Sequence, residues 1–465
     1  MRNTARTRRG PTAATRVPAA RAAIAATVLV LGLSLAACGN NGGVGGASNA
    51  GQASVTAGQT VTLNYWTWFP AQATLQKSIS AFEAANPTIK INLREFSNTD
   101  YQKELPLALG GGQSLDIVGV QVSAMTNTVS SQLRPVSTWE SDLPTTWRSQ
   151  INATMLDQTQ KIAKNDTLYS IPMGSIGSAF VYSNQALLTK AGITAEPATE
   201  ADLAADVAKI KTADPGVTPV TFSGESWWQD EMFFTVADQI DPKLSDELYT
   251  GKVAWNSPQM VQALTAYQNL FSSGTLDKGT LSLKEADADN AFNSGKAAFL
   301  VEGSWNSSVL SSAYRQANGI SVADVGAGAF PVAVTGGQPA ARTYAEGGLA
   351  IPKDSKYVAQ AAKFIQFMTV GDGVSTWAPD LVLVPSLNGY TIPSTVLTSP
   401  AAQSGYAAIQ SLINAGGSGR GEYSTNFTSD VLDNSLLDVA RGNVTPQAEA
   451  TSLQTAWASG RYPLQ

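Results

Sequence analysis

Histidine is absent from this chain of 465 residues, and cysteine occurs once, at Cys38. Without histidine the chain cannot build a Ser-His-Asp or Cys-His catalytic centre, a histidine-ligated zinc site or a histidine-based pH switch. A single cysteine excludes a disulfide within the chain and a cysteine-rich metal site. Only 14% of the residues are charged, whereas 43% are hydrophobic. This balance provides a large core and excludes a chain that is disordered as a whole.

The first 37 residues have the pattern of a secretion signal. Six arginines lie before residue 22 with no acid among them, and the uncharged apolar run 22–37 follows. That run is short for a membrane span and ends beside Cys38. Without residues 1–37 the formal charge falls from −6 to −12, because the removed segment holds six arginines and no acid. Such a charge disfavours non-specific binding to nucleic acid.

The end of the signal is more specific. Residues 35–38 (Leu-Ala-Ala-Cys) resemble the lipobox of bacterial lipoproteins. The resemblance implies cleavage before Cys38, a lipid such as palmitate on that cysteine, and attachment to the extracytoplasmic face of a bacterial membrane. A buried free cysteine is the alternative, which the position directly after the apolar run disfavours. Residues 38–60, rich in Gly, Asn, Ser and Ala, predict a flexible tether.

From residue 61 onward, strand and helix patterns alternate. Residues 61–66, 89–96 and 116–120 read as strands, because β-branched and apolar residues recur at the spacing of a half-buried or buried strand. Helical patterns fall between them, around 75–86 and over 101–109. Further helices are expected over 258–274, 355–368 and 430–441, with Ser257 capping the first and Asp354 or Ser355 the second. Alternation of this kind predicts a sheet with parallel strands, in which ligands bind at the carboxyl ends of the strands.

Motifs for other chemistries are weak or missing. The glycines near residue 326 lack the third glycine of a dinucleotide loop, and no phosphate loop or nucleophile elbow occurs. Glu285, Asp287 and Asp289 alternate like calcium ligands, but Phe292 stands where such a loop needs glycine, so a solvated helix face is expected instead. We expect no metal and no cofactor. A pair of carboxyl groups for glycoside hydrolysis stays open, because any two acids can meet in a fold.

Tryptophan is the residue that points most directly to a ligand. The chain has ten, and several lie at strand ends or in loops beside Thr, Pro, Ser and Gly. A flat apolar ring with polar neighbours suits the C–H faces of a sugar, while nearby amides and carboxylates accept its hydroxyl hydrogens. Packing in the core is the alternative for any one of them.

Six segments, taken in order, resemble the family-1 extracellular solute-binding proteins of ABC importers, the group with maltose- and multiple-sugar-binding proteins. The resemblance covers about residues 60–465 and rests on the following segments: YWTW, FEAANPTIKINLREF, LDIVGVQ, LYSIPMGSIGSAFVYSNQALLTKAGI, AFNSGKAAFLVEGSW and YAEGGLAIPKDSKYVAQAAKFIQFMT. It implies an α/β periplasmic-binding-protein fold, in which two lobes close like a clamshell and three chain crossings join them. The crossings are expected near 171–176, 345–348 and 383–386. The first lobe would then hold 60–172 and 348–383, and the second 177–345 and 386–465.

The resemblance also implies a binding site, and no catalysis. The expected ligand-binding residues lie in loops after strands and at the crossings: Trp66, Trp68, Gln121, Ser175, Glu225, Trp227, Trp228, Trp305, Glu346, Gly347, Gly348, Arg420 and Tyr423. Asp116 is expected to be structural. Whether the side chain of Glu302 faces the ligand or the core is left open. The expected partners are a carbohydrate and the membrane subunits of an ABC permease, with the chain itself a monomer. Three alternatives remain: a non-sugar solute such as a polyamine, a surface-tethered glycan hydrolase, and a receptor that passes its closed form to a sensor.

Overall fold

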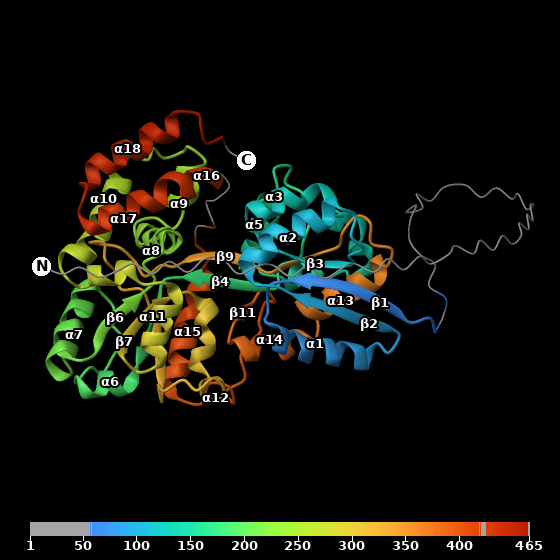
Figure 1. The fold of residues 1–465 in the computed structure, drawn as a ribbon, viewed down its shortest axis with the longest axis horizontal. Coiled ribbons are helices and arrows are strands. Elements are labelled where there is room, and N and C mark those ends of the chain that lie inside the picture. The colour runs from blue at the N-terminus through green and yellow to red at the C-terminus, as the bar shows by residue number, and fades with distance from the viewer. Residues whose placement is uncertain (1–55, 57, 418, 420–424, 464–465) are drawn as a thin grey trace, which may run out of the picture. The chain divides into compact units, whose positions relative to one another are not determined.

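The computed structural model describes residue 56, residues 58–417, residue 419 and residues 425–463 (Figure 1). The predicted signal, Cys38, Arg420 and Tyr423 lie outside these residues. Across the described part of the chain, no helix is both long and apolar enough to cross a bilayer.

The first of two four-stranded sheets has the strand order β10-β3-β1-β2. Its strands are β1 (Val61–Thr67), β2 (Ile89–Glu95), β3 (Ile117–Val120) and β10 (Gly348–Ala350). Strand β1 pairs in parallel with β2 and β3, and β10 pairs antiparallel with β3. The predicted strands and their parallel pairing are therefore confirmed. We call this sheet and the helices packed on it the first lobe.

Successive side chains of β1 enter two different hydrophobic cores, one on each face of the sheet. Leu63 and Tyr65 enter one core, whereas Trp66 enters another. Successive residues of a strand point to opposite faces, so both faces of the sheet need cover. Helices α1, α13 and α14 lie on one side and α2, α3 and α5 on the other (Figure 1). The helices of the lobe are α1 (Gln72–Ala85), α2 (Asn98–Gly110), α3 (Ala124–Val129), α4 (Trp147–Gln150), α5 (Ala153–Lys161), α13 (Val358–Thr369) and α14 (Val374–Leu381).

Asp116 joins the first strand to the segment before α13. Its carboxylate accepts hydrogen bonds from the Asn64 backbone N–H at 3.0 Å and from the Ser355 hydroxyl at 2.8 Å. The structural role expected for Asp116 is confirmed. The expected cap of α13 is wrong: the helix begins after Tyr357 with no side-chain cap, because the Ser355 hydroxyl donates to Asp116 and accepts from the Tyr357 N–H.

The second four-stranded sheet has the order β6-β7-β5-β8. Its strands are β5 (Phe180–Asn184), β6 (Thr218–Phe222), β7 (Ala297–Glu302) and β8 (Val325–Ala329). Strands β6 and β7 are parallel, and β5 is antiparallel to both β7 and β8. We call this sheet and its helices the second lobe. Those helices are α6 (Gln185–Lys190), α7 (Glu200–Ala213), α8 (Ser226–Asp238), α9 (Leu244–Tyr249), α10 (Pro258–Ser272), α11 (Glu285–Asn293), α12 (Ser312–Ala317), α15 (Pro400–Ala415), α16 (Thr425–Phe427), α17 (Asp433–Arg441) and α18 (Pro446–Ala458).

Two of these helices show how the sequence sets their ends. Helix α10 begins as expected, because the Ser257 hydroxyl accepts from the Met260 N–H at 3.3 Å and Pro258 occupies the first helical position. The helix expected over 430–441 begins earlier, as α16 (Thr425–Phe427), passes through a single π-helical turn, η6 (Thr428–Leu432), and continues as α17. Such wide turns occur frequently at functional sites.

A third, three-stranded sheet runs between the two lobes. It has the order β11-β4-β9 and is antiparallel, with β4 (Gly174–Ser178), β9 (Arg342–Glu346) and β11 (Val384–Pro385). Figure 1 shows β4 and β9 running from one group of elements to the other. These strands include parts of the three segments expected to be crossings. The exact lobe boundaries stay a prediction.

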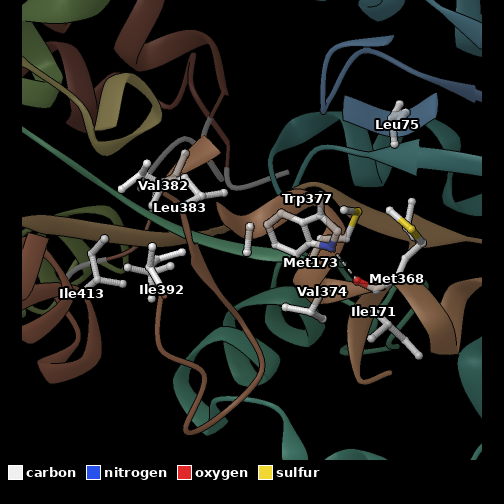
Figure 2. Close-up of a cluster of buried hydrophobic side chains, with 14 of the residues drawn as sticks. Leu75, Ile171, Met173, Met368, Val374, Trp377, Val382, Leu383, Ile392 and Ile413 are labelled. Atoms are coloured by element: carbon white, nitrogen blue, oxygen red, sulfur yellow. Dashed lines mark hydrogen bonds between the residues drawn. The ribbon is translucent and has the colours of Figure 1, made fainter. Parts of the chain in front are cut away.

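Buried apolar side chains pack beside these crossing segments. Figure 2 shows Met173 and Ile171 near Trp377 of α14 and Met368 of α13, with Leu383 farther away beside Val382. The indole N–H of Trp377 donates to the Met368 carbonyl at 3.0 Å, so the buried ring leaves no polar atom without a partner.

Candidate functional site

The carboxyl ends of several strands open into one cavity of about 750 Å³ between the sheets. From the first lobe its lining residues are Trp68, Phe69, Asn98, Thr99, Gln121, Ser123 and Ala124. From the second lobe they are Glu225, Trp227, Asp230, Glu231, Glu285, Trp305, Thr428, Ser429 and Asp433. Strands β4 and β9 contribute Ile176 and Glu346. The site therefore lies where a sheet with parallel strands is expected to bind a ligand.

Six predicted site residues line this cavity: Trp68, Gln121, Glu225, Trp227, Trp305 and Glu346. Each follows or ends a strand, which explains why local sequence reasoning could find them. Trp68 follows β1, Gln121 follows β3, and Trp305 follows β7. Their role in binding stays a prediction.

On the first-lobe side, Trp68 is held by its neighbours. Its ring lies 5.2 Å from that of Tyr101, whose hydroxyl donates to the carbonyls of Trp66 (2.9 Å) and Gly119 (2.8 Å). Tyr101 thereby joins the ends of β1 and β3 and fixes the surface beneath Trp68. Trp66 itself does not line the cavity: it is 5% exposed and packs against Phe96.

On the second-lobe side, a buried indole supports two cavity rings. Trp228 is fully buried and makes edge contacts with Trp227 at 5.8 Å and with Trp305 at 5.9 Å. It does not line the cavity, so in this structure it holds the two rings that do. Trp227 is 37% exposed, one of the most exposed large hydrophobic side chains among the described residues.

Three predicted residues at the crossings also lie outside the lining. Ser175 is buried, with its hydroxyl 3.4 Å from that of Ser386. Gly347 has a φ of +68°, and a Cβ there would lie 3.1 Å from the ring of Phe69. A Cβ on Gly348 would lie 2.4 Å from the Ser170 hydroxyl. The glycines allow close packing behind the cavity wall.

Polar side chains at the rim of the cavity are held by hydrogen bonds on both of its sides. The Gln121 amide donates to Glu346 Oε1 at 3.4 Å and accepts from Gln102 at 2.7 Å, which links the first lobe to β9. Within the second lobe, the Glu225 carboxylate accepts from the Glu285 backbone N–H at 3.0 Å. These bonds leave amide and carboxylate groups at the edge of the cavity, where both donors and acceptors are offered.

Six carboxylates line the cavity, of which sequence reasoning missed four: Asp230, Glu231, Glu285 and Asp433. Asp230 and Glu231 lie in the middle of α8, among buried residues on every side. Two adjacent acids inside the apolar run WWQDEMFF were the available signal, since buried charges need partners. Their partner, Arg342, comes from β9, more than a hundred residues later.

Three neighbouring acids at and near the cavity wall, Glu285, Asp289 and Glu302, are half-buried or buried. Burial and the Glu225 charge raise the pKa of Glu285, and burial and Glu285 raise the pKa of Asp289 to about 7. Glu302 is fully buried, and burial and the two neighbouring acids raise its pKa well above its usual range. The expected solvated helix face is found at Asp287, which is exposed, whereas Asp289 is half-buried and its Oδ1 atom is buried.

No group of three or more His, Cys, Asp and Glu side chains in the described part of the chain is placed to hold a metal ion. A second hollow of about 640 Å³ lies over α11 and α12, lined by residues such as Asn290, Asn293 and Tyr314. It shares no lining residue with the cavity and contains none of the predicted site residues.

Known proteins share this fold and part of this sequence. The bacterial extracellular solute-binding protein family matches residues 66–370. A putative binding protein of Brucella abortus (strain 2308) is 23% identical over 222 residues, 48% of this chain and 52% of that protein. The chain thus spans about half the length of the curated relatives it matches.

Solved structures superpose over most of the chain. A protein of Caldanaerobius polysaccharolyticus, from work on xylan utilization, has a TM-score of 0.68 at 19% identity, over 85% of this chain and 100% of that one. An ABC substrate-binding protein of Listeria monocytogenes, in complex with cycloalternan, has a TM-score of 0.67 at 18% identity, over 86% and 99%. Maltose-bound MalE3 of T. maritima has a TM-score of 0.66 at 17% identity, again over 86% and 99%.

These likenesses establish the α/β periplasmic-binding-protein fold, and the family match covers well over half of the chain. The chain belongs to the bacterial extracellular solute-binding protein family, which is a family of binding proteins and not of enzymes.

Proposed function

We propose that the cavity captures a carbohydrate, as a mono- or oligosaccharide, and that the protein delivers it to the permease of an ABC importer. The observation that carries this proposal is the set of three indole rings, Trp68, Trp227 and Trp305, in one cavity with amide and carboxylate groups. Indole faces pack on sugar C–H groups, and the polar rim pairs with hydroxyls. Solved structures of the same fold were obtained with maltose and with cycloalternan.

We propose that two lobes close around the ligand. Residues 60–172 with 348–383 would form one lobe and 177–345 with 386–465 the other, joined through β4, β9 and β11. The assignment of α15 supports this, because it packs mainly against β8 of the second sheet. A ligand that contacts both lobes favours the closed form only by its extra affinity for that form. The closed form would then dock on the permease, or on a sensor.

We also propose that Cys38 carries a lipid, which would hold the body on the extracytoplasmic face of the membrane through the segment 38–60. The lipobox-like residues before Cys38 support this. Mass spectrometry of the protein expressed in a bacterium tests it. Cleavage before Cys38 with an added lipid mass is expected, and the variant Cys38→Ser should lose both.

Binding is tested by intrinsic tryptophan fluorescence and thermal shift against mono- and oligosaccharides. A saturable change with one sugar group, without conversion of the sugar, supports the proposal. Micromolar affinity would correspond to about −8 kcal/mol. The variant Trp227→Ala should weaken binding at least about tenfold, or about 1.4 kcal/mol. Tyr314→Ala is the matched control, since Tyr314 is equally exposed at 36% but lies away from the cavity.

A polyamine is the second candidate, because six carboxylates line the cavity beside the aromatic rings. Ammonium groups bind both carboxylates and ring faces. If no sugar changes the fluorescence or the unfolding temperature and spermidine gives a saturable change, the polyamine replaces the carbohydrate as the proposed ligand. The fold is unaffected by that outcome. Hydrolysis of glycans is set aside, because the family is one of binding proteins.

A further inference from the structure

A fully buried arginine lies behind the cavity wall. Arg342 is 0% exposed and is the first residue of β9, one of the strands between the lobes. A buried charge is costly unless it is paired and hydrogen-bonded. Arg342 should therefore have carboxylate partners, and the ion pairs should hold those carboxylates in a fixed place.

Two of those partners are cavity residues. Arg342 Nη1 lies 2.9 Å from Asp230 Oδ2 and 3.5 Å from Glu231 Oε2. Both acids lie on α8 and line the cavity. Adjacent residues of a helix point about 100° apart and do not face each other by default. One guanidinium nitrogen between them draws the two carboxylates together.

Further contacts fix this arrangement from the strands between the lobes. The Tyr344 hydroxyl, also on β9, donates to Glu231 Oε1 at 3.2 Å, and the Ser178 hydroxyl of β4 donates to Glu231 Oε2. The Arg342 guanidinium also lies over the Phe234 ring, 5.1 Å from its centroid. Carboxylates held in this way lose little further freedom when a ligand binds.

We propose that Arg342 is a positioning residue, which holds Asp230 and Glu231 as a fixed pair of acceptors that selects a ligand by two adjacent hydrogen-bond donors. This inference deepens the proposed function and rests on it. A carboxylate only accepts hydrogen bonds, and its bonds are stronger than those of neutral acceptors. Neighbouring hydroxyls on one sugar ring supply two such donors.

The shape of the guanidinium is part of this requirement, because Nη1 contacts both carboxylates while Nε donates to the Gly419 carbonyl at 3.5 Å and the plane lies over the Phe234 ring. A guanidinium is planar and always charged and offers donors in several directions at once, whereas an ammonium is a point charge on a flexible chain. The variant Arg342→Lys should therefore restore only part of what Arg342→Met loses. A role in stability alone would predict the same loss of affinity for every ligand.

The test measures dissociation constants by calorimetry for wild type, Arg342→Met, Arg342→Lys and Asp230→Asn. The probes are the best sugar of the panel, each of its monodeoxy analogues, and spermidine. Wild type should discriminate against two neighbouring deoxy positions by about tenfold or more each. In Arg342→Met and Asp230→Asn this discrimination should fall to about threefold or less at those positions, with the other positions unaffected.

Folding of each variant is checked by circular dichroism and thermal unfolding. If Arg342→Met does not fold, Asp230→Asn carries the test, because the amide keeps the shape of the side chain and leaves Arg342 paired with Glu231. An unchanged deoxy pattern in the folded variants would overturn the inference while the sugar proposal stands.

The remaining outcomes separate the two proposals. Binding of spermidine but of no sugar, weakened in the same variants, would overturn the sugar proposal and keep the positioning role of Arg342. No binding of any probe by the wild-type protein would overturn both.

Discussion

Asp289 offers a direct test of the electrostatics behind the cavity. It lies on α11, and among the described residues its Oδ1 atom is buried with no hydrogen-bond partner. Burial and the neighbouring Glu285 raise its pKa from 3.8 to about 7. The substitution Asp289→Asn keeps the shape of the side chain and removes its titration.

The sign of the effect follows from the direction of that change. The pKa of Asp289 is higher in the folded protein than in the unfolded chain, so folding takes up a proton between about pH 4 and pH 7. Stability therefore falls as pH rises through this window. A rise in pKa from 3.8 to about 7 corresponds to at most about 4 kcal/mol of lost stability above pH 7.

Urea unfolding followed by far-UV circular dichroism measures this difference at about pH 4.5, 6 and 7.5. The stability of Asp289→Asn relative to wild type should rise with pH and level off above about pH 7.5, by about 2–4 kcal/mol in total. The control is Asp287→Asn, because Asp287 is an exposed acid on the same helix. The difference in unfolding free energy between this variant and wild type should stay nearly constant with pH. A constant difference between Asp289→Asn and wild type across the three pH values would refute the reasoning.

Three further substitutions test packing. Gly224→Ala should cost about 1–3 kcal/mol, because its Cβ would lie 2.3 Å from a main-chain carbonyl carbon of η4 (Lys278–Ser282), whereas Gly216→Ala, with its nearest atom at 3.7 Å, should change the unfolding midpoint little. Leu75→Ala should cost about 2–5 kcal/mol, since Leu75 is fully buried in the core of Figure 2, while Leu107→Ala, 71% exposed, should cost under about 0.5 kcal/mol by urea unfolding. Trp228→Ala should weaken sugar binding about tenfold in calorimetry although Trp228 does not line the cavity, and unchanged affinity would show that its support of the cavity rings is dispensable.

Local sequence patterns predict much of the first sheet and several helix ends. The alternation of 61–66 and the apolar spacing of Leu75, Ile79 and Phe82 correspond to β1 and α1 in the structure. Ser257 and Pro258 likewise mark the first residues of α10. Such signals depend on sterics, capping and burial within a few residues, so they survive without knowledge of the rest of the chain.

The aromatic part of the site was partly visible in the same way. Trp68 and Trp305 follow strands, and the carboxyl ends of strands in such folds carry the ligand. The sequence could not separate Trp68 from Trp66, which lies two positions before it, or Trp227 from Trp228, which is the next residue. Only packing decided that Trp66 enters a core beside Phe96 and that Trp228 supports its neighbours from behind.

The sequence by itself therefore determined the alternating α/β pattern, the family and the strand ends at which the cavity lies. Only the tertiary structure decided which side chains share the cavity and which charges meet. Asp230 and Glu231 are joined to Arg342 across more than a hundred residues, and the Oδ1 atom of Asp289 is buried on a helix whose sequence predicts a solvated face. The physical reason is that burial and pairing of a charge depend on neighbours brought in by distant segments, which no local pattern specifies.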